Sequence, residues 1–265
     1  MNKAYCIRQN LYIEILSYHP DLIIPRKESF ILNETLEYKF YTKLWYKLKR
    51  LSIVLGLDIR PICVDMKKAL IKDGHFENKS SSEIKSGIFN QLVIIFISFS
   101  FIITTKKMAN IHLEFIHIFL VGLCQSFGIA FYLAYAQVMK NQRFSSFSKV
   151  FEFTYSFKSQ LLMKVETASI LQNLDFSSLQ SIKNQRLSII IEQLQLLIKK
   201  NMKLGEDITL DLGLLIEDTW DLLEYNYEEF LKALSILRVF VLLFFFLIPY
   251  FYIIYILLTK IGEQL

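Results

Sequence analysis

The carboxyl-terminal part of the chain contains the stretch Val239–Leu258, VFVLLFFFLIPYFYIIYILL, whose only polar side-chain atoms are tyrosine hydroxyls. A helix rises about 1.5 Å per residue, so a stretch of this length covers about 30 Å, the thickness of the hydrocarbon core of a bilayer. The stretch therefore predicts a membrane-spanning helix.

Two further apolar stretches, 87–105 and 115–136, lie close together in the middle of the chain. The first contains several polar residues, so a buried helix of a soluble protein is the alternative interpretation there. These residues are Asn90, Gln91, Ser98 and Ser100. The short polar segment KKMAN at 106–110 favours a transmembrane hairpin instead. The sequence thus predicts three spans, with 1–86 and 137–236 as polar regions on one side of the membrane.

Basic residues near the spans predict the orientation, because loops on the cytoplasmic side carry an excess of lysine and arginine. On the far side of the membrane the bases are Lys106, Lys107 and Lys260. Those on the side of the polar regions are Lys67, Lys68, Lys72, Lys79, Lys85, Lys140, Arg143, Lys149, Lys232 and Arg238. We therefore expect a multi-pass protein of an inner (cytoplasmic) membrane with a cytoplasmic amino terminus. In an organelle, the polar regions would instead lie on the matrix side. No signal-peptide pattern precedes residue 86.

Composition predicts an all-α fold, because the chain has only eight glycines and four prolines in 265 residues. The net charge of +5 is explained by the bases near the spans and does not favour nucleic-acid binding. Cys6, Cys63 and Cys124 are far apart in the sequence, which favours neither a disulfide framework nor a zinc site.

Apolar residues recur at helical spacing in both polar regions, and in the first region they do so over 30–54. In the second region the expected helices are 147–173, 177–203 and 209–232. Such helices can close small bundles, so we expect two cytoplasmic helical domains. The expected divisions are a first helical domain at 1–86, a transmembrane hairpin at 87–136, a second helical domain at 137–236, and a last span with a short tail at 237–265.

The two polar regions share a short motif, LGLDI at 55–59 and LGEDI at 204–208. Each motif follows a long amphipathic helix, and the distance from Gly56 to Ile88 equals that from Gly205 to Leu237, where spans begin. Two unrelated helix ends, each followed by an aspartate cap, are the alternative. The shared order of helix, turn, helix and span favours an internal repeat. The residues of its two turns are Gly56, Asp58, Gly205 and Asp207.

This order of elements resembles that of the type II secretion system F family, the inner-membrane platform proteins of type II secretion, type IV pilus and tight-adherence pilus systems. The turn at 203–208 is similar to a glycine-containing turn of that family, and Pro249 to a proline often found in its last span. The chain departs from the family in its short first domain and in lacking a clear Gly-Glu-x-x-Gly element. The resemblance implies a non-catalytic, homo-oligomeric scaffold in the lipid bilayer that couples a cytoplasmic assembly ATPase to pilin or pseudopilin subunits.

Between Leu204 and Leu231 the chain has nine acidic residues and no basic one, whereas the corresponding part of the first region mixes acids with Lys67, Lys68, Lys72 and Lys79. The acids can attract the first region or bind a basic partner such as the ATPase. A solvated helix face is the alternative. The candidate docking residues are Asp207, Asp211, Asp218, Asp221 and Glu224.

Motifs for catalysis or cofactor binding are absent from the sequence, so we expect no enzyme, cofactor or metal. His112 and His117 lie near Glu114, but a spacing of five places the imidazoles on different helix faces, which favours interfacial side chains over a metal site. A second hypothesis is an accessory structural subunit of an energy-transducing respiratory or organellar complex, which the composition also fits. Co-purifying proteins distinguish the two hypotheses.

Overall fold

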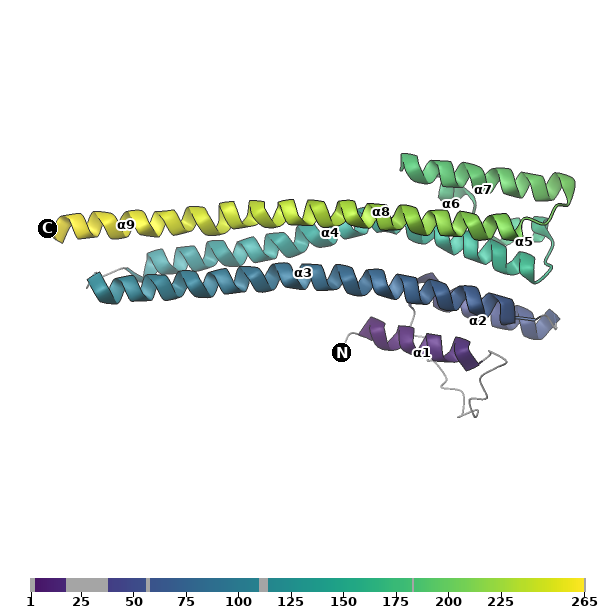
Figure 1. The fold of residues 1–265 in the computed structure, drawn as a ribbon, viewed down its shortest axis with the longest axis horizontal. Coiled ribbons are helices and arrows are strands. Elements are labelled where there is room, and N and C mark those ends of the chain that lie inside the picture. Colours follow the sequence, from purple (N-terminus) through teal and green to yellow (C-terminus); the bar gives the residue numbers. More distant parts are fainter. Residues whose placement is uncertain (1–2, 18–37, 56–57, 110–113, 183, 265) are drawn as a thin grey trace. The chain divides into compact units, whose positions relative to one another are not determined.

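The computed structural model describes residues 3–17, 38–55, 58–109, 114–182 and 184–264. Within these ranges every regular element is a helix, which confirms the all-α prediction (Figure 1). The elements in chain order are α1 (Lys3–Ser17), α2 (Lys39–Leu55), α3 (Arg60–Ala109), α4 (Phe115–Leu162), α5 (Thr167–Asn173), α6 (Ser177–Gln180), α7 (Gln185–Leu204), α8 (Thr209–Val241), the π-helix η1 (Leu242–Leu247) and α9 (Ile248–Gln264).

Three helical segments are long and apolar enough to cross a membrane, Arg60–Lys107, Phe115–Leu162 and Thr209–Gly262. Each is longer than its apolar stretch. The expected turn at 106–110 lies largely within α3, and α4 continues through the polar residues after 136. The reason is that 137–162 has no glycine or proline, so nothing interrupts the backbone hydrogen bonds of the helix.

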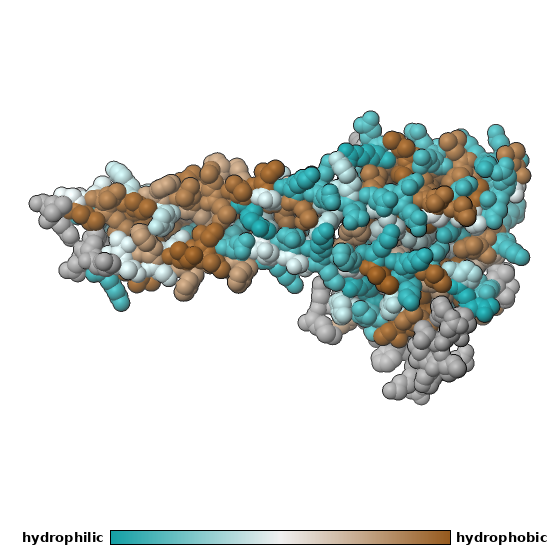
Figure 2. Space-filling view, in the orientation of Figure 1, coloured by the Kyte–Doolittle hydropathy of each residue, from teal (hydrophilic) through white to brown (hydrophobic). Residues whose placement is uncertain are grey.

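Contacts divide the chain into two compact units. We call Met1–Glu77 with Phe144–Tyr225 the head unit, and Asn78–Arg143 with Asn226–Leu265 the membrane unit. The visible face of the membrane unit is mostly apolar, whereas that of the head unit is mostly polar (Figure 2). Large side chains such as Phe96 and Phe115, 74% and 79% exposed, give the membrane unit an outer surface suited to lipid.

A single hydrophobic core in the head unit contains side chains from both polar regions of the sequence. At its centre the indole Nε1 of Trp220 on α8 donates a hydrogen bond to the Tyr155 hydroxyl on α4, at 3.0 Å. The Trp220 ring lies 4.3 Å from that of Phe151 on α4 and 6.0 Å from that of Phe76 on α3. Because the core is shared, the structure does not confirm two separate helical bundles.

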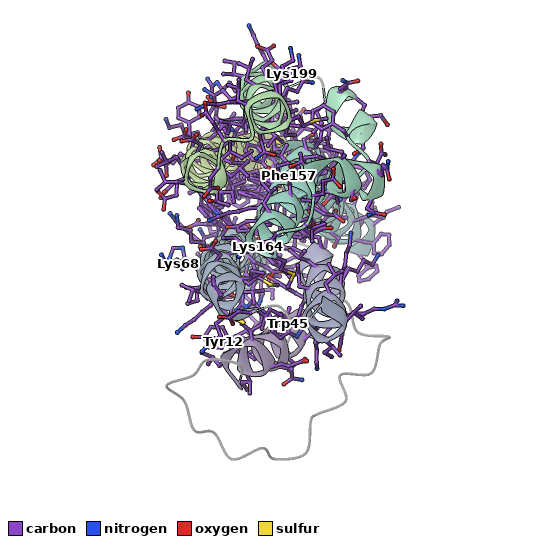
Figure 3. The ribbon with its side chains drawn as sticks, turned by 90° about the vertical axis from the view of Figure 1, so that its right-hand side faces the viewer. Tyr12, Trp45, Lys68, Phe157, Lys164 and Lys199 are labelled. Carbon is purple, nitrogen blue, oxygen red and sulfur yellow. The ribbon has the colours of Figure 1, made fainter. Side chains whose placement is uncertain are left out.

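The amino-terminal helices join the same core. Trp45 of α2 and Phe157 of α4, both labelled in Figure 3, are completely buried in it. Polar contacts reinforce this packing, since the Tyr38 hydroxyl donates to Asp73 at 2.7 Å and to Glu77 at 3.0 Å on α3. Burial and these two carboxylates raise the pKa of Tyr38, which therefore stays a neutral hydrogen-bond donor.

The helix expected at 147–173 is interrupted, because α4 ends at Leu162 and α5 begins at Thr167. Lys164 adopts a left-handed conformation with φ +55° and donates its backbone N–H to Leu161 O at 2.8 Å. The N–H of Val165 bonds to Gln160 O at 3.0 Å, which completes a Schellman C-cap. Lysine is an unusual residue for this position, so the sequence carried no signal for the break.

In the membrane unit, α3, α4 and the third span pack through close approaches at glycine. A Cβ atom added at Gly128 of α4 would lie 2.6 Å from the Cβ of Phe245 in η1. The rings of Phe101 on α3 and Tyr250 on α9 have centroids 5.5 Å apart. Small residues allow such approaches between membrane helices, where packing and not water exclusion drives association.

We expect Trp220→Ala to lower the free energy of unfolding by about 3–5 kcal/mol, because it removes the ring that joins α3, α4 and α8 in the head core. Thermal unfolding of the full chain in detergent, followed by circular dichroism, measures the loss. Leu214→Ala, on the same helix but 55% exposed, is the control and should leave the midpoint nearly unchanged. Equal midpoints for the two variants would contradict the assignment of the core.

Candidate functional site

The turn between α7 and α8 has the geometry of a helix end followed directly by a helix start. Gly205 adopts φ +66° and donates its N–H to Asn201 O at 2.9 Å. The Asp207 carboxylate accepts the backbone N–H of Thr209 at 2.9 Å, which caps α8. This bond and that from the Thr209 hydroxyl lower the pKa of Asp207, so the cap stays ionised. Asp207 thus has a structural role.

The turn before α3 repeats part of this geometry. The Asp58 carboxylate accepts the backbone N–H of Arg60, also two residues further on, at 3.0 Å. The residue after each aspartate is a buried isoleucine, Ile59 or Ile208, 6% and 1% exposed. The carbonyl of each isoleucine accepts a hydrogen bond from the N–H four residues on. Gly56 lies outside the described residues, so an internal repeat stays a prediction.

Asn201 holds the second turn in place and was not singled out from the sequence. Its side-chain Nδ2 donates to Glu206 O at 2.7 Å, and its Oδ1 accepts from the Thr167 hydroxyl on α5. The neighbouring Lys200 forms an ion pair with Glu206 at 2.6 Å. A single asparagine near the end of an amphipathic helix gives no signal of such a role, since its partner Thr167 is distant in sequence.

Three of the candidate docking residues, Asp218, Asp221 and Glu224, are exposed on α8. Their spacing of three places them on one side of the helix, and we call them the acidic ridge. The opposite side of α8 is buried in the head core, with Trp220 at its centre. Among the residues that the structure describes, the three carboxylates have no ion pair or hydrogen bond. Asp211 is half-buried and Asp207 is exposed but accepts the Thr209 N–H, so the ridge is the part of the predicted surface that is both exposed and unbonded.

Lysines of α3 in the head unit contact aromatic rings. Lys72 Nζ lies 5.8 Å from the centroid of Trp220, and Lys67 Nζ lies 5.9 Å from that of Tyr12. Such contacts are cation–π interactions. No ion pair between these lysines or Lys68 and the acidic ridge occurs within the described part of the chain. The negative charge of the ridge therefore faces outward.

The described residues contain no group of three or more side chains suited to hold a metal ion. His117 Nδ1 and the Tyr252 hydroxyl are 3.1 Å apart, and this hydrogen bond joins α4 to α9 in the membrane unit. His112, the other histidine of that segment, lies outside the described residues. His117 is thus bound within the packing of the spans.

The three long apolar helical segments and the polar head unit fit the class of multi-pass α-helical membrane proteins. Comparison of the chain with protein-family models, with curated proteins and with solved structures finds no match.

We expect Gly205→Ala to cost about 1–2 kcal/mol of unfolding free energy, because a Cβ atom disfavours the left-handed conformation at this turn. Gly213→Ala is the matched control, since Gly213 lies inside α8 and an added Cβ would meet only the flexible end of Lys158, at 3.4 Å. Alanine favours a helix, so this control should be neutral or stabilising. Chemical denaturation of both variants measures the difference, and equal stabilities would contradict the strained turn.

Proposed function

We propose that this protein is a non-catalytic membrane platform that couples a cytoplasmic assembly ATPase to pilin-like or pseudopilin-like subunits in the bilayer. The observation that carries the proposal is the acidic ridge, a free charged surface on the helix that also enters the third span. Helix α8 runs from Thr209 to Val241 without interruption, so the ridge and the first residues of the span at 239–258 belong to one helix.

Continuous helices support a mechanical role. Like α8, α3 and α4 each contain residues of the head unit and residues of a candidate span. In this proposal the continuous backbone of such a helix lets a partner that tilts the helical head displace the spans as well. In this proposal the spans pass that movement to a subunit held beside them in the bilayer.

The charge of the acidic ridge supports a basic partner. Complementary charge mainly sets partner choice and the rate of association, and its effect weakens as salt rises. The ridge bears three carboxylates on one side of α8, outside the head core. We therefore propose that the ATPase presents a basic surface to the ridge and that their association is sensitive to ionic strength.

Topology supports the cytoplasmic side for this contact. The two polar regions share a core, which supports their placement on the same side of the membrane, as the two spans between them require. The excess of lysine and arginine on this side favours the cytoplasm. A cytoplasmic ATPase then reaches the ridge directly.

We expect the triple variant Asp218→Lys, Asp221→Lys, Glu224→Lys to lose the ATPase and filament assembly while keeping the wild-type melting temperature. The ridge is exposed, so charge reversal should disrupt binding of the basic partner and leave the head core intact. The measurement is co-purification of partners with the tagged full chain from its native membrane, together with a count of surface filaments.

The control carries Glu152→Lys and Glu192→Lys, which reverse two other exposed acids of the head unit. It should retain both the ATPase and the filaments. Normal assembly by the ridge variant would refute the docking surface. Recovery of redox or proton-translocating subunits with the wild type would refute the platform function itself and favour an accessory subunit.

A further inference from the structure

Two glutamines are buried in the middle of the membrane unit, Gln91 on α3 and Gln125 on α4. Both are 0% exposed, and within the described residues neither the nitrogen nor the oxygen of either amide has a hydrogen-bond partner. A buried amide without partners costs several kcal/mol, and hydrocarbon around the bundle offers none. We call this pair the glutamine layer.

The pairing of α3 with α4 places the two glutamines close together along the bundle. Gly87 lies against Tyr132, and Phe99 lies against Gly122, so the two helices run antiparallel with a known register. Counting inward puts Gln91 level with Gly128 from the first contact and with Ala130 from the second, three to five residues beyond Gln125. At about 1.5 Å per residue the two side chains start about one to one and a half helical turns apart along the helix axes.

The third span is irregular at the same level. Gly128 lies one turn from Gln125 on α4, and an added Cβ there would meet the Cβ of Phe245, which belongs to the π-helix η1. Residues three apart share a helix face, so Gln125 is on the face of α4 that meets η1. π-helical turns of this kind often occur at functional sites.

A backbone carbonyl is released in this irregular segment. The N–H of Ile248 donates to Leu243 O, five residues back, so it is displaced from Phe244 O, its partner in a regular α-helix. The π-helical donor to Phe244 O would be residue 249, which is proline and has no N–H. Phe244 is 45% exposed, so this carbonyl lies on the outer face of the span and not on the face that meets α4.

The surroundings select a neutral ligand. No Asp, Glu, Lys, Arg or His occurs in 87–105, 118–139 or 239–259, so the site has no charged side chain to hold a metal ion or an anion. Toward the hairpin the bundle closes with an apolar cluster from all three spans. Its buried members are Ile102, Val121, Ile253 and Leu257.

We infer that Gln91 and Gln125 form a binding site for water at the centre of the membrane unit. Each amide supplies two donors and an acceptor oxygen, a set that suits water with its three or four hydrogen bonds. The inference depends on the three spans and not on the proposed platform function.

Nuclear magnetic resonance of the isotope-labelled full chain in lipid nanodiscs tests the site. The side-chain amide signals of Gln91 and Gln125, assigned by through-bond connection to the backbone, should both show cross-peaks to water. Gln160 is the control, because it is 2% exposed and donates to Ser156 O at 3.1 Å, so its amide should show none. A direct contact between the Gln91 and Gln125 amides without water cross-peaks would overturn the proposal.

A double-mutant cycle gives a second readout. Gln91→Leu and Gln125→Leu should each lower the melting temperature in nanodiscs, since each leaves the remaining amide with fewer partners. The double variant should lose less than the two shifts combined, because it replaces the polar layer by apolar side chains. Asn90→Leu, an exposed neighbour, should cause no loss. Additive losses would show two independent glutamines and overturn the shared site.

Discussion

Hydrocarbon supplies no hydrogen-bond partners, so every backbone amide that crosses it must be satisfied within the protein. This constraint explains why the chain forms α3, α4 and the α8–α9 segment as long helices, and why irregularity in a span is confined to one place. That place is η1, where Pro249 removes an N–H in the middle of the third span. The buried amides of Gln91 and Gln125 lie near this level of the bundle, and within the described residues neither has a hydrogen-bond partner.

The second organising feature is the shared core of the head unit. Trp220 joins α8 to Phe76 of α3 and to Tyr155 of α4, and Lys158 of α4 pairs with Asp65 of α3 at 2.6 Å. These residues come from the two polar regions that the hairpin separates in sequence. Neither region needs a complete core of its own, which accounts for the small size of the first. Sharing the core also turns the acidic side of α8 outward.

Much of this structure was predictable from local sequence. Length and composition identify the three spans, because burial in hydrocarbon leaves few alternatives to a helix. The turns at Asp58 and Asp207 were also found, since a capping aspartate acts only two residues away. The end of α4 was missed, because Lys164 occupies a position that glycine normally marks.

Other features depend on residues far apart in sequence. Trp220 and Phe76 each look like an ordinary apolar residue of an amphipathic helix, so the shared core is visible only in three dimensions. Gln91 was noted as an interruption of the first span, whereas Gln125 and the register that brings it near Gln91 were not. Of the predicted docking surface, the structure leaves Asp218, Asp221 and Glu224 free and assigns Asp207 to a helix cap.

The central claim is that the hairpin crosses the membrane and returns both polar regions to one side. Single cysteines at three exposed lysines, Lys68→Cys, Lys199→Cys and Lys106→Cys, test it in a background with Cys6, Cys63 and Cys124 replaced by serine. A membrane-impermeant thiol reagent is applied to sealed vesicles of one orientation. The account predicts that residues 68 and 199 react from the same side and residue 106 from the opposite side. Labelling of all three from one side would contradict it.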